Sequence, residues 1–273
     1  MPSATGPTCG TGAAFGRGGG TACRPREIPR ESNETRTDYR CRLPSDIVAA
    51  LRGRARMPEL DDVEFARNPD PRAPVVLLLD TSGSMAGRPI QELNAGLKVL
   101  HSDLEQDELA SRRVELAIVS FGSNDVCVEQ DFVECRNWIP PVLIAGGSTP
   151  MGRAIQTALD LLRARKTKYR ENGINYYRPW AFLLTDGAPT DGWTSAAERI
   201  RQEEASQSVA FFAVGVEGAD MQTLANIAPR PPVLLRGLSF QELFLWLSAR
   251  QKRVSASKVG EQVELPPIGW ATV

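Results

Sequence analysis

The amino-acid sequence predicts an α/β fold in which a doubly wound, mostly parallel sheet is flanked by helices. Apolar runs of strand length alternate with amphipathic helical patterns along most of the chain. Two runs, 74–80 and 179–186, are apolar at nearly every position, as expected of strands buried on both faces of a parallel sheet. The chain has 273 residues, 42% of them hydrophobic, and is therefore long enough to bury such a core.

The sequence of the first half of the domain predicts three strands and a helix. After strand 74–80, Pro89 suits the first turn of a helix, and leucines then recur at helical spacing. The next two strands, 114–121 and 125–132, are separated by too few residues for a crossover helix. We therefore expect the third strand to pair antiparallel with the second.

The second half continues the alternation of helix and strand. The expected helices open at Thr149-Pro150, near Ser195, at Asp220 and at Ser239, and the expected strands cover 179–186, 209–216 and 232–236. Ser195 with Glu198, and Ser239 with Glu242, have the spacing of capping boxes. The predicted strand order is 3-2-1-4-5-6, a common order for doubly wound sheets.

We expect one folded domain over 57–254, between two segments of different composition. Residues 1–56 carry ten Arg, no Lys and five acidic residues, and their first part is rich in Gly. Such a composition buries too little apolar surface to offset the chain entropy. We therefore expect either a disordered N-terminal extension or upstream sequence wrongly included before a start at Met57. Residues 255–273 are polar and Pro-rich, and we expect a surface tail.

Composition argues against several classes of protein. With 32 basic and 33 acidic residues the net charge is −1, which argues against a nucleic-acid binder. No apolar run is long enough to span a membrane, and the N-terminus lacks the apolar core of a signal peptide, so we expect a cytoplasmic protein. The five cysteines show no CxxC spacing and there is one histidine, so we expect reduced thiols rather than a zinc site.

Two buried strands end in an aspartate, at Asp80 and Asp186. In the predicted order these strands are neighbours at the point where the order reverses, where doubly wound sheets bind ligands. Ser82 and Ser84 follow the first aspartate, and Thr149 follows a glycine-rich turn. Two carboxylates and three hydroxyls form an all-oxygen set, which selects a hard cation: Mg²⁺ first, then Mn²⁺ or Ca²⁺. So few carboxylates leave the ion residual positive charge, so an acidic side chain of a protein partner could complete its shell.

The same residues resemble those of a known family. The segment Asp80-Thr81-Ser82-Gly83-Ser84 is similar to the DxSxS motif of von Willebrand factor type A (VWA) domains. Thr149 and Asp186 match the separate threonine and aspartate of that family's metal-ion-dependent adhesion site. The resemblance implies a Rossmann-like fold and a role in protein–protein interaction. It also implies a complete Mg²⁺ site, with the three hydroxyls as direct ligands and both aspartates bound directly or through water.

Three further stretches, 147–152, 185–191 and 244–248, resemble one branch of that family, the bacterial TerY-like proteins of tellurite-resistance and stress gene clusters. The resemblance covers about 59–254. It implies an adaptor that works with a Ser/Thr protein kinase and a PP2C-type phosphatase in a bacterial stress response.

The alternative hypothesis is an enzyme, a Mg²⁺-dependent phosphatase or phosphotransferase of the haloacid-dehalogenase-like type, which also places an aspartate after the first strand. That chemistry needs a second acid two residues later, where this chain has Ser82. A serine hydrolase needs a histidine near its nucleophile, and the one histidine, His101, lies several helical turns away. We therefore predict a binding module without enzyme activity. We also expect Asp191 to be a turn or cap residue and His101 to be a boundary or core residue.

Overall fold

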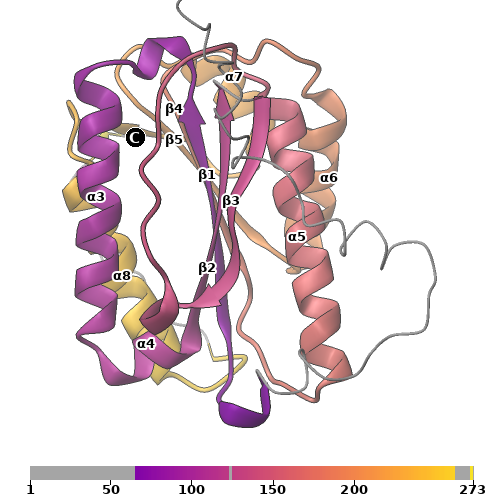
Figure 1. The fold of residues 1–273 in the computed structure, drawn as a ribbon. Helices are drawn as coiled ribbons and strands as arrows, with labels where there is room; N and C mark the ends of the chain where they lie inside the picture. Colours follow the sequence, from indigo (N-terminus) through magenta and orange to yellow (C-terminus); the bar gives the residue numbers. More distant parts are fainter. Residues whose placement is uncertain (1–64, 123–124, 262–270, 273) are drawn as a thin grey trace, which may run out of the picture. The chain divides into compact units, whose positions relative to one another are not determined.

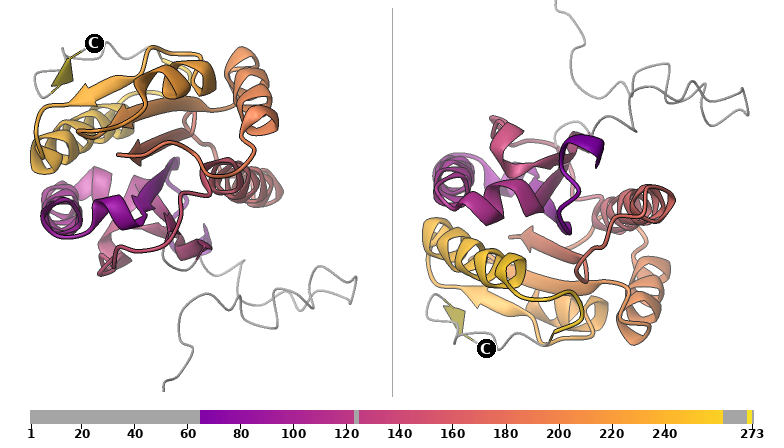
Figure 2. Two further views of the ribbon diagram at one scale, coloured as in Figure 1. Left: turned by 90° about the horizontal axis from the view of Figure 1, so that it is seen from above. Right: turned by 90° about the horizontal axis from the view of Figure 1, so that it is seen from below.

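The computed structural model describes residues 65–122, 125–261 and 271–272. These residues form one sheet with helices on both of its faces (Figure 1 and Figure 2). The predicted N-terminal extension, 1–56, and most of the predicted C-terminal tail lie outside the described residues.

The sheet has the order β3-β2-β1-β4-β5-β6-β7. Its strands are β1 (Ala73–Thr81), β2 (Val114–Gly122), β3 (Asp125–Glu134), β4 (Trp180–Thr185), β5 (Ala210–Gly215), β6 (Val233–Leu235) and β7 (Ala271–Thr272). In the sheet, β2, β1, β4, β5 and β6 lie side by side in that order and pair parallel. Strand β3 lies at the edge next to β2 and runs antiparallel to it. The predicted order of the first six strands is therefore confirmed. Strand β7, which was not predicted, pairs antiparallel with β6.

Helices cover the sheet in two groups. They are α3 (Arg88–Glu105), α4 (Glu108–Arg113), α5 (Met151–Glu171), α6 (Thr194–Ala205), α7 (Met221–Ile227) and α8 (Phe240–Ala256), with short 3-10 turns η1 (Gly83–Met85) and η2 (Cys135–Asn137). Helices α3, α4 and α8 lie over one face, and α5, α6 and α7 lie over the other (Figure 2). None of the described helices combines the length and the apolar character needed to cross a bilayer.

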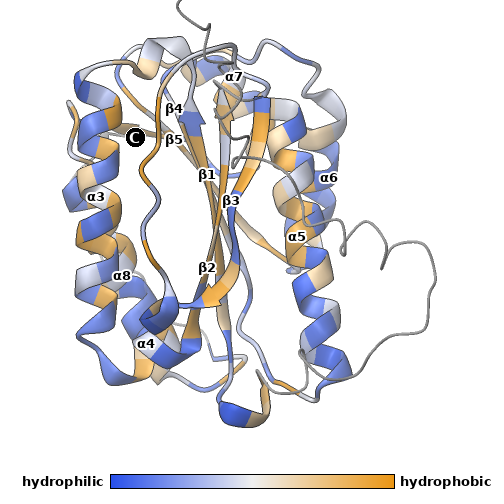
Figure 3. Ribbon diagram, viewed as in Figure 1, coloured by the Kyte–Doolittle hydropathy of each residue, from blue (hydrophilic) through white to orange (hydrophobic). Residues whose placement is uncertain are grey.

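Strand β1 lies between two hydrophobic cores, which explains its apolar sequence. Val75, Leu77 and Leu79 join the core under α3 and α8, whereas Val76 and Leu78 join the core under α5 and α6. All five side chains are fully buried. Figure 3 shows apolar residues concentrated along the strands and on the inner sides of the helices. Packing on both faces therefore fixes the strand end that carries Asp80.

The helix starts correct two of the sequence predictions. Helix α6 begins at Thr194, so Ser195 lies inside its first turn and does not cap it. Ser239 occupies the N-cap position of α8 as predicted, but its side chain makes no cap hydrogen bond. Asp220 caps α7, which confirms that prediction. Asp107 caps α4, a helix that was not predicted.

The end of the sheet opposite the carboxyl ends of the parallel strands holds a buried ionic network. Glu115 on β2 lies 2.8 Å from Arg72 Nε and accepts a hydrogen bond from Arg165 Nε over 2.7 Å. The Tyr169 hydroxyl also donates to Glu115, and Arg72 pairs with Glu134 at 3.2 Å. All five side chains are buried. Buried charges are costly unless they are paired, so these contacts fix how α5 and the segment before β1 meet the sheet.

One of the described cysteines is a free thiol. Cys135 is free and buried. Burial, with a smaller effect of the nearby Glu105 charge, raises the pKa of its thiol to about 12.

Candidate metal centre

The carboxyl ends of β1 and β4 place the two predicted aspartates next to each other. Asp80 is the penultimate residue of β1, and Asp186 directly follows β4. The strands are parallel neighbours, with Leu79 paired to Leu184, so their ends meet at one edge of the sheet (Figure 1). This is the edge at which the strand order reverses, as the sequence predicted.

A chain of hydrogen bonds links four of the five predicted ligands. The Ser82 N–H donates to Asp80 Oδ1 over 2.8 Å. The hydroxyls of Ser82 and Ser84 are 3.0 Å apart, and Ser84 Oγ donates to Asp186 Oδ1 over 2.7 Å. The oxygens of these four residues are therefore already gathered at one place.

Backbone hydrogen bonds attach the loop that carries Thr149, the fifth predicted ligand. The Gly146 N–H donates to the Thr81 carbonyl over 2.8 Å, and the Gly83 N–H donates to the Gly147 carbonyl over 3.1 Å. The glycine-rich turn before Thr149 is thus bonded to the loop that follows β1.

Gly187 shows that the hydroxyl of Thr149 faces the same place as the hydroxyl of Ser84. A Cβ atom built on Gly187 would lie 3.5 Å from Thr149 Oγ1 and 3.9 Å from Ser84 Oγ. The two hydroxyls therefore converge on the residue that follows Asp186. All five predicted residues are brought together.

A second glycine, Gly122, allows the loop that follows β1 to lie close to β2. A Cβ at Gly122 would come within 2.2–2.5 Å of backbone atoms of Thr81 and Ser82, and its φ of 155° is one that side-chain-bearing residues rarely adopt. Any larger residue here would displace the loop that carries the serines.

Asp80 is fully buried, and this governs its ionisation. Burial raises its pKa; hydrogen bonds from Ser82 and Thr185 lower it, and the nearby charge of Asp186 raises it again, for a net increase. Thr185 donates its hydroxyl to Asp80 Oδ2, the oxygen that Ser82 leaves free. A cation beside a carboxylate favours its ionised form, so a bound metal ion would offset the cost of burying this charge.

The donor set fits a hard cation that is held largely by hydroxyls. Within the described ranges, no three His, Cys, Asp or Glu side chains are grouped to hold a metal ion. A cation at this edge would therefore depend on Ser82, Ser84 and Thr149 as well as on the two aspartates. Oxygen ligands without imidazole or thiolate are typical of Mg²⁺, Mn²⁺ and Ca²⁺ sites.

The two residues predicted to be structural are structural. Asp191 accepts hydrogen bonds from the N–H groups of Gly152 and Arg153, both over 2.9 Å, and so caps α5. His101 packs edge-on against Trp138 with ring centres 5.5 Å apart, and its side chain is 23% exposed. The sequence analysis missed the supporting hydroxyl of Thr185, because nothing in the local pattern showed that it would reach the neighbouring strand.

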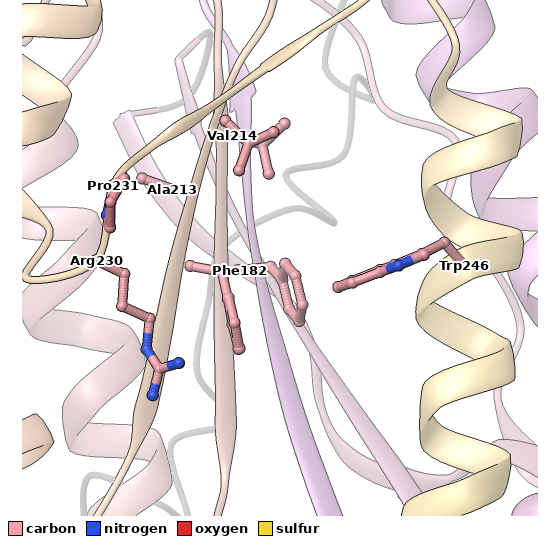
Figure 4. Close-up of a pocket in the computed structure, with 8 residues that line it drawn as sticks. Phe182, Ala213, Val214, Arg230, Pro231 and Trp246 are labelled. Carbon is pink, nitrogen blue, oxygen red and sulfur yellow. The ribbon is translucent and has the colours of Figure 1, made fainter. Parts of the chain in front are cut away.

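A separate cavity lies between α8 and the sheet (Figure 4). Phe182 and Phe212 stack with ring centres 4.6 Å apart, and Trp246 meets Phe182 edge-on. The guanidinium of Arg230 lies 5.1 Å from the centre of the Phe212 ring. The remaining lining residues are Ala213, Val214, Pro231 and Val233, so the lining offers neither a nucleophile nor an acid–base pair.

Known proteins resemble this chain over its α/β domain. A family model described as von Willebrand factor type A domain matches residues 75–243, more than half of the chain. The human collagen alpha-1(XXI) chain is 33% identical over 92 residues, which are 32% of this chain and 8% of the collagen.

Two solved structures of bacterial pilus proteins are also similar. The pilus adhesin SpaC from Lactobacillus rhamnosus GG has a TM-score of 0.53 at 15% identity, over 68% of this chain and 30% of that one. The vWF domain of the type V pili tip protein Mfa5 from Porphyromonas gingivalis has a TM-score of 0.48 at 11% identity, over 71% and 99%. This chain spans less than a tenth of the collagen and under a third of SpaC, and the likeness to SpaC shows the fold alone.

Proposed function

This chain belongs to the von Willebrand factor type A domain family, and we propose that it is a metal-dependent protein-interaction module. The proposed ligands are Asp80, Ser82, Ser84, Thr149 and Asp186. The proposed ion is Mg²⁺, with Mn²⁺ or Ca²⁺ as substitutes.

The observation that carries the proposal is the hydrogen-bond chain from Asp80 through both serines to Asp186. It gathers oxygen donors from two loops that the chain separates by about a hundred residues. A cation could exchange these hydrogen bonds for coordination without a rearrangement of the strands.

The exposure of the five residues indicates where a partner would bind. Asp80, Ser82 and Thr149 are buried, whereas Ser84 is exposed and Asp186 is half-buried. The site therefore opens on the side of Ser84 and Asp186. Three of the five ligands are neutral hydroxyls, so the ion keeps enough attraction for a further anion. We propose that the partner supplies this anion as an Asp or Glu carboxylate at the open side.

The sequence resemblance supports a narrower proposal. The stretches 147–152, 185–191 and 244–248 favour a TerY-like adaptor in a bacterial stress or tellurite-resistance system. Its proposed partners are a Ser/Thr protein kinase and a PP2C-type phosphatase. The proposed location is the cytoplasm. Cell fractionation tests this location, and recovery of the protein outside the cytosolic fraction would contradict it.

We propose that the module has no turnover of its own. The acid that a haloacid-dehalogenase-like phosphatase needs two residues after its aspartate is replaced by Ser82, whose hydroxyl faces Ser84 rather than a base. No observation favours that alternative over the binding module.

A capture experiment tests the proposal. The purified protein is incubated with native lysate in Mg²⁺, in EDTA, and as the variants Thr149→Ala and Thr167→Ala. Thr167 is a matched control, because it lies on α5, the helix that follows Thr149, and its hydroxyl bonds only within that helix: it donates to the Arg163 carbonyl and accepts from Arg170. We expect capture in Mg²⁺ and by the control, and loss in EDTA and in Thr149→Ala. The same partners in all four samples would contradict the proposal.

A further inference from the structure

The loop that carries Asp186 continues into residues that hold Thr149 on both sides of its backbone. Thr190 Oγ1 accepts a hydrogen bond from the Thr149 N–H over 3.0 Å. The Thr190 N–H donates in turn to the Thr149 carbonyl over 2.9 Å. Both backbone polar groups of Thr149 are therefore bonded to this one residue.

The next residue along, Asp191, bonds to the start of the helix that follows Thr149. Its Oδ1 accepts from the Gly152 N–H and its Oδ2 from the Arg153 N–H, each over 2.9 Å. Helix α5 has Pro150 at its N-cap, with no cap hydrogen bond of its own. A carboxylate at a helix N-terminus satisfies unpaired N–H groups and interacts favourably with the helix dipole.

Close backbone contact completes the junction. A Cβ atom at Gly152 would lie 2.3 Å from the Gly192 carbonyl oxygen and 3.0 Å from the Trp193 Cα. Nothing larger than glycine fits between the start of α5 and the end of the Asp186 loop. The two loops therefore meet through three consecutive residues, 190–192, which we call the clamp.

The need for such a clamp follows from what precedes Thr149. Residues 138–150 form no helix or strand, so no regular hydrogen-bond pattern of their own fixes the position of Thr149. A metal ligand has to be held within a few tenths of an ångström, and residues around the ligands usually provide this restraint.

We propose that Thr190 and Asp191 are positioning residues for the metal site, which hold Thr149 against the Asp186 loop so that ligands on two loops move as one unit. This inference rests on the proposed function. It assigns to the clamp a role in metal affinity in addition to its role in helix capping. Replacing a residue that orients a metal ligand typically weakens metal binding about 10-fold to 100-fold.

Four variants separate positioning from general stability. Thr190→Val keeps the branched shape but removes the acceptor for the Thr149 N–H, and Thr190→Ser restores a hydroxyl. Asp191→Ala removes the cap of α5. Asp107→Ala removes an equivalent cap, since Asp107 accepts from the Ala110 N–H over 2.8 Å at the start of α4, before β2 and away from the site.

The first measurement is the Kd for Mn²⁺ alone, by calorimetry, with thermal unfolding of each variant alongside. We expect Thr190→Val and Asp191→Ala to weaken binding about 10-fold or more, while Thr190→Ser and Asp107→Ala bind like the wild type. Asp191→Ala and Asp107→Ala should lower the melting temperature comparably. If Thr190→Val and Asp191→Ala bind Mn²⁺ as Asp107→Ala does, the positioning role is overturned.

The second measurement needs no metal. Amide hydrogen exchange should accelerate at Thr149 in Thr190→Val, and at Gly152 and Arg153 in Asp191→Ala. Unchanged exchange at these amides would overturn the clamp itself. Wild-type protein that binds no Mn²⁺ would instead overturn the proposed function, and the exchange rates would then decide the clamp separately.

Discussion

Ser84 Oγ donates a hydrogen bond to Asp186 Oδ1 over 2.7 Å, although 102 positions separate the two residues in the chain. The serine belongs to the loop after β1 and the aspartate to the loop after β4. Both oxygens are proposed metal ligands, so a cation has to replace this hydrogen bond by coordination. We therefore expect the free energy of binding a metal ion without a partner to be small.

The first prediction concerns this weak affinity. If the Kd for Mn²⁺ is about 1 mM, then about 1 mM metal stabilises the protein by only RT ln 2, or about 0.4 kcal/mol. We expect a rise in melting temperature of about 1–2 °C, measured by calorimetric scans with metal and with EDTA. A shift of about 10 °C or more in metal alone would indicate a self-sufficient cage and would contradict the need for a partner's carboxylate.

The second prediction concerns the buried ionic network. Glu115→Gln keeps the shape of the side chain but removes the charge that Arg72 and Arg165 share. Leaving buried charges without a partner costs about 3–5 kcal/mol, so the urea midpoint should fall sharply. Glu92→Gln is the control, because its 3.8 Å pair with Arg88 is on the surface and is worth at most about 1 kcal/mol. Equal midpoints for the two variants would contradict the account of the network.

The third prediction concerns the domain boundary. A chain truncated to start at Met57 retains Arg72 and should fold and bind Mn²⁺ like the full chain, with residues 1–40 of the full chain unprotected in hydrogen exchange. A chain truncated to start at Ala73 loses Arg72 and leaves Glu115 and Glu134 without this partner, so it should be insoluble or unfolded. Slow exchange within 1–40, or insolubility of the chain that starts at Met57, would show that the N-terminal region packs on the domain.

The fourth prediction concerns acid stability. Burial raises the pKa of Glu204. Hydrogen bonds from Arg230 and the Phe211 N–H, together with the charges of Arg230 and Arg178, lower this pKa by more, so it falls below its usual value of 4.5. The folded state thus favours the charged form. The resulting stability is present above about pH 4.5 and is lost as the pH falls through the lowered pKa.

The variant Glu204→Gln should therefore lose stability less steeply below about pH 4.5 than the wild type does, as measured by thermal unfolding across a pH series. Glu198→Gln, exposed on the same helix α6, is the control and should follow the wild-type curve. Parallel curves for Glu204→Gln and the wild type would contradict the assignment.

Features set by neighbouring residues in the sequence were predicted correctly. Runs 74–80 and 179–186 can be apolar throughout only if both faces are buried, so their pattern alone identified the central strands. The aspartates at their ends then identified the edge of the sheet that carries the candidate site. The antiparallel third strand followed from the length of one connection.

Contacts between remote segments could not be predicted in the same way. Asp191 caps a helix whose capped amides lie 38 and 39 positions earlier, and no local pattern names that partner. Glu115 is a polar interruption in an apolar strand, and its cations come from other elements. The Ser195 pattern placed the start of α6 one residue late. Trp193, which packs partly against the core, occupies the N-cap position instead.

The most direct test of the proposed site is a calorimetric titration of Mn²⁺ into the wild type, Asp80→Asn and Thr149→Ala. Asparagine keeps an oxygen that can accept from the Ser82 N–H, so Asp80→Asn should stay folded, and a thermal scan checks this for each protein. The account predicts binding heat for the wild type and none for either folded variant. Equal heats for the wild type and the two variants would show that these oxygens do not hold the ion and would contradict the central claim.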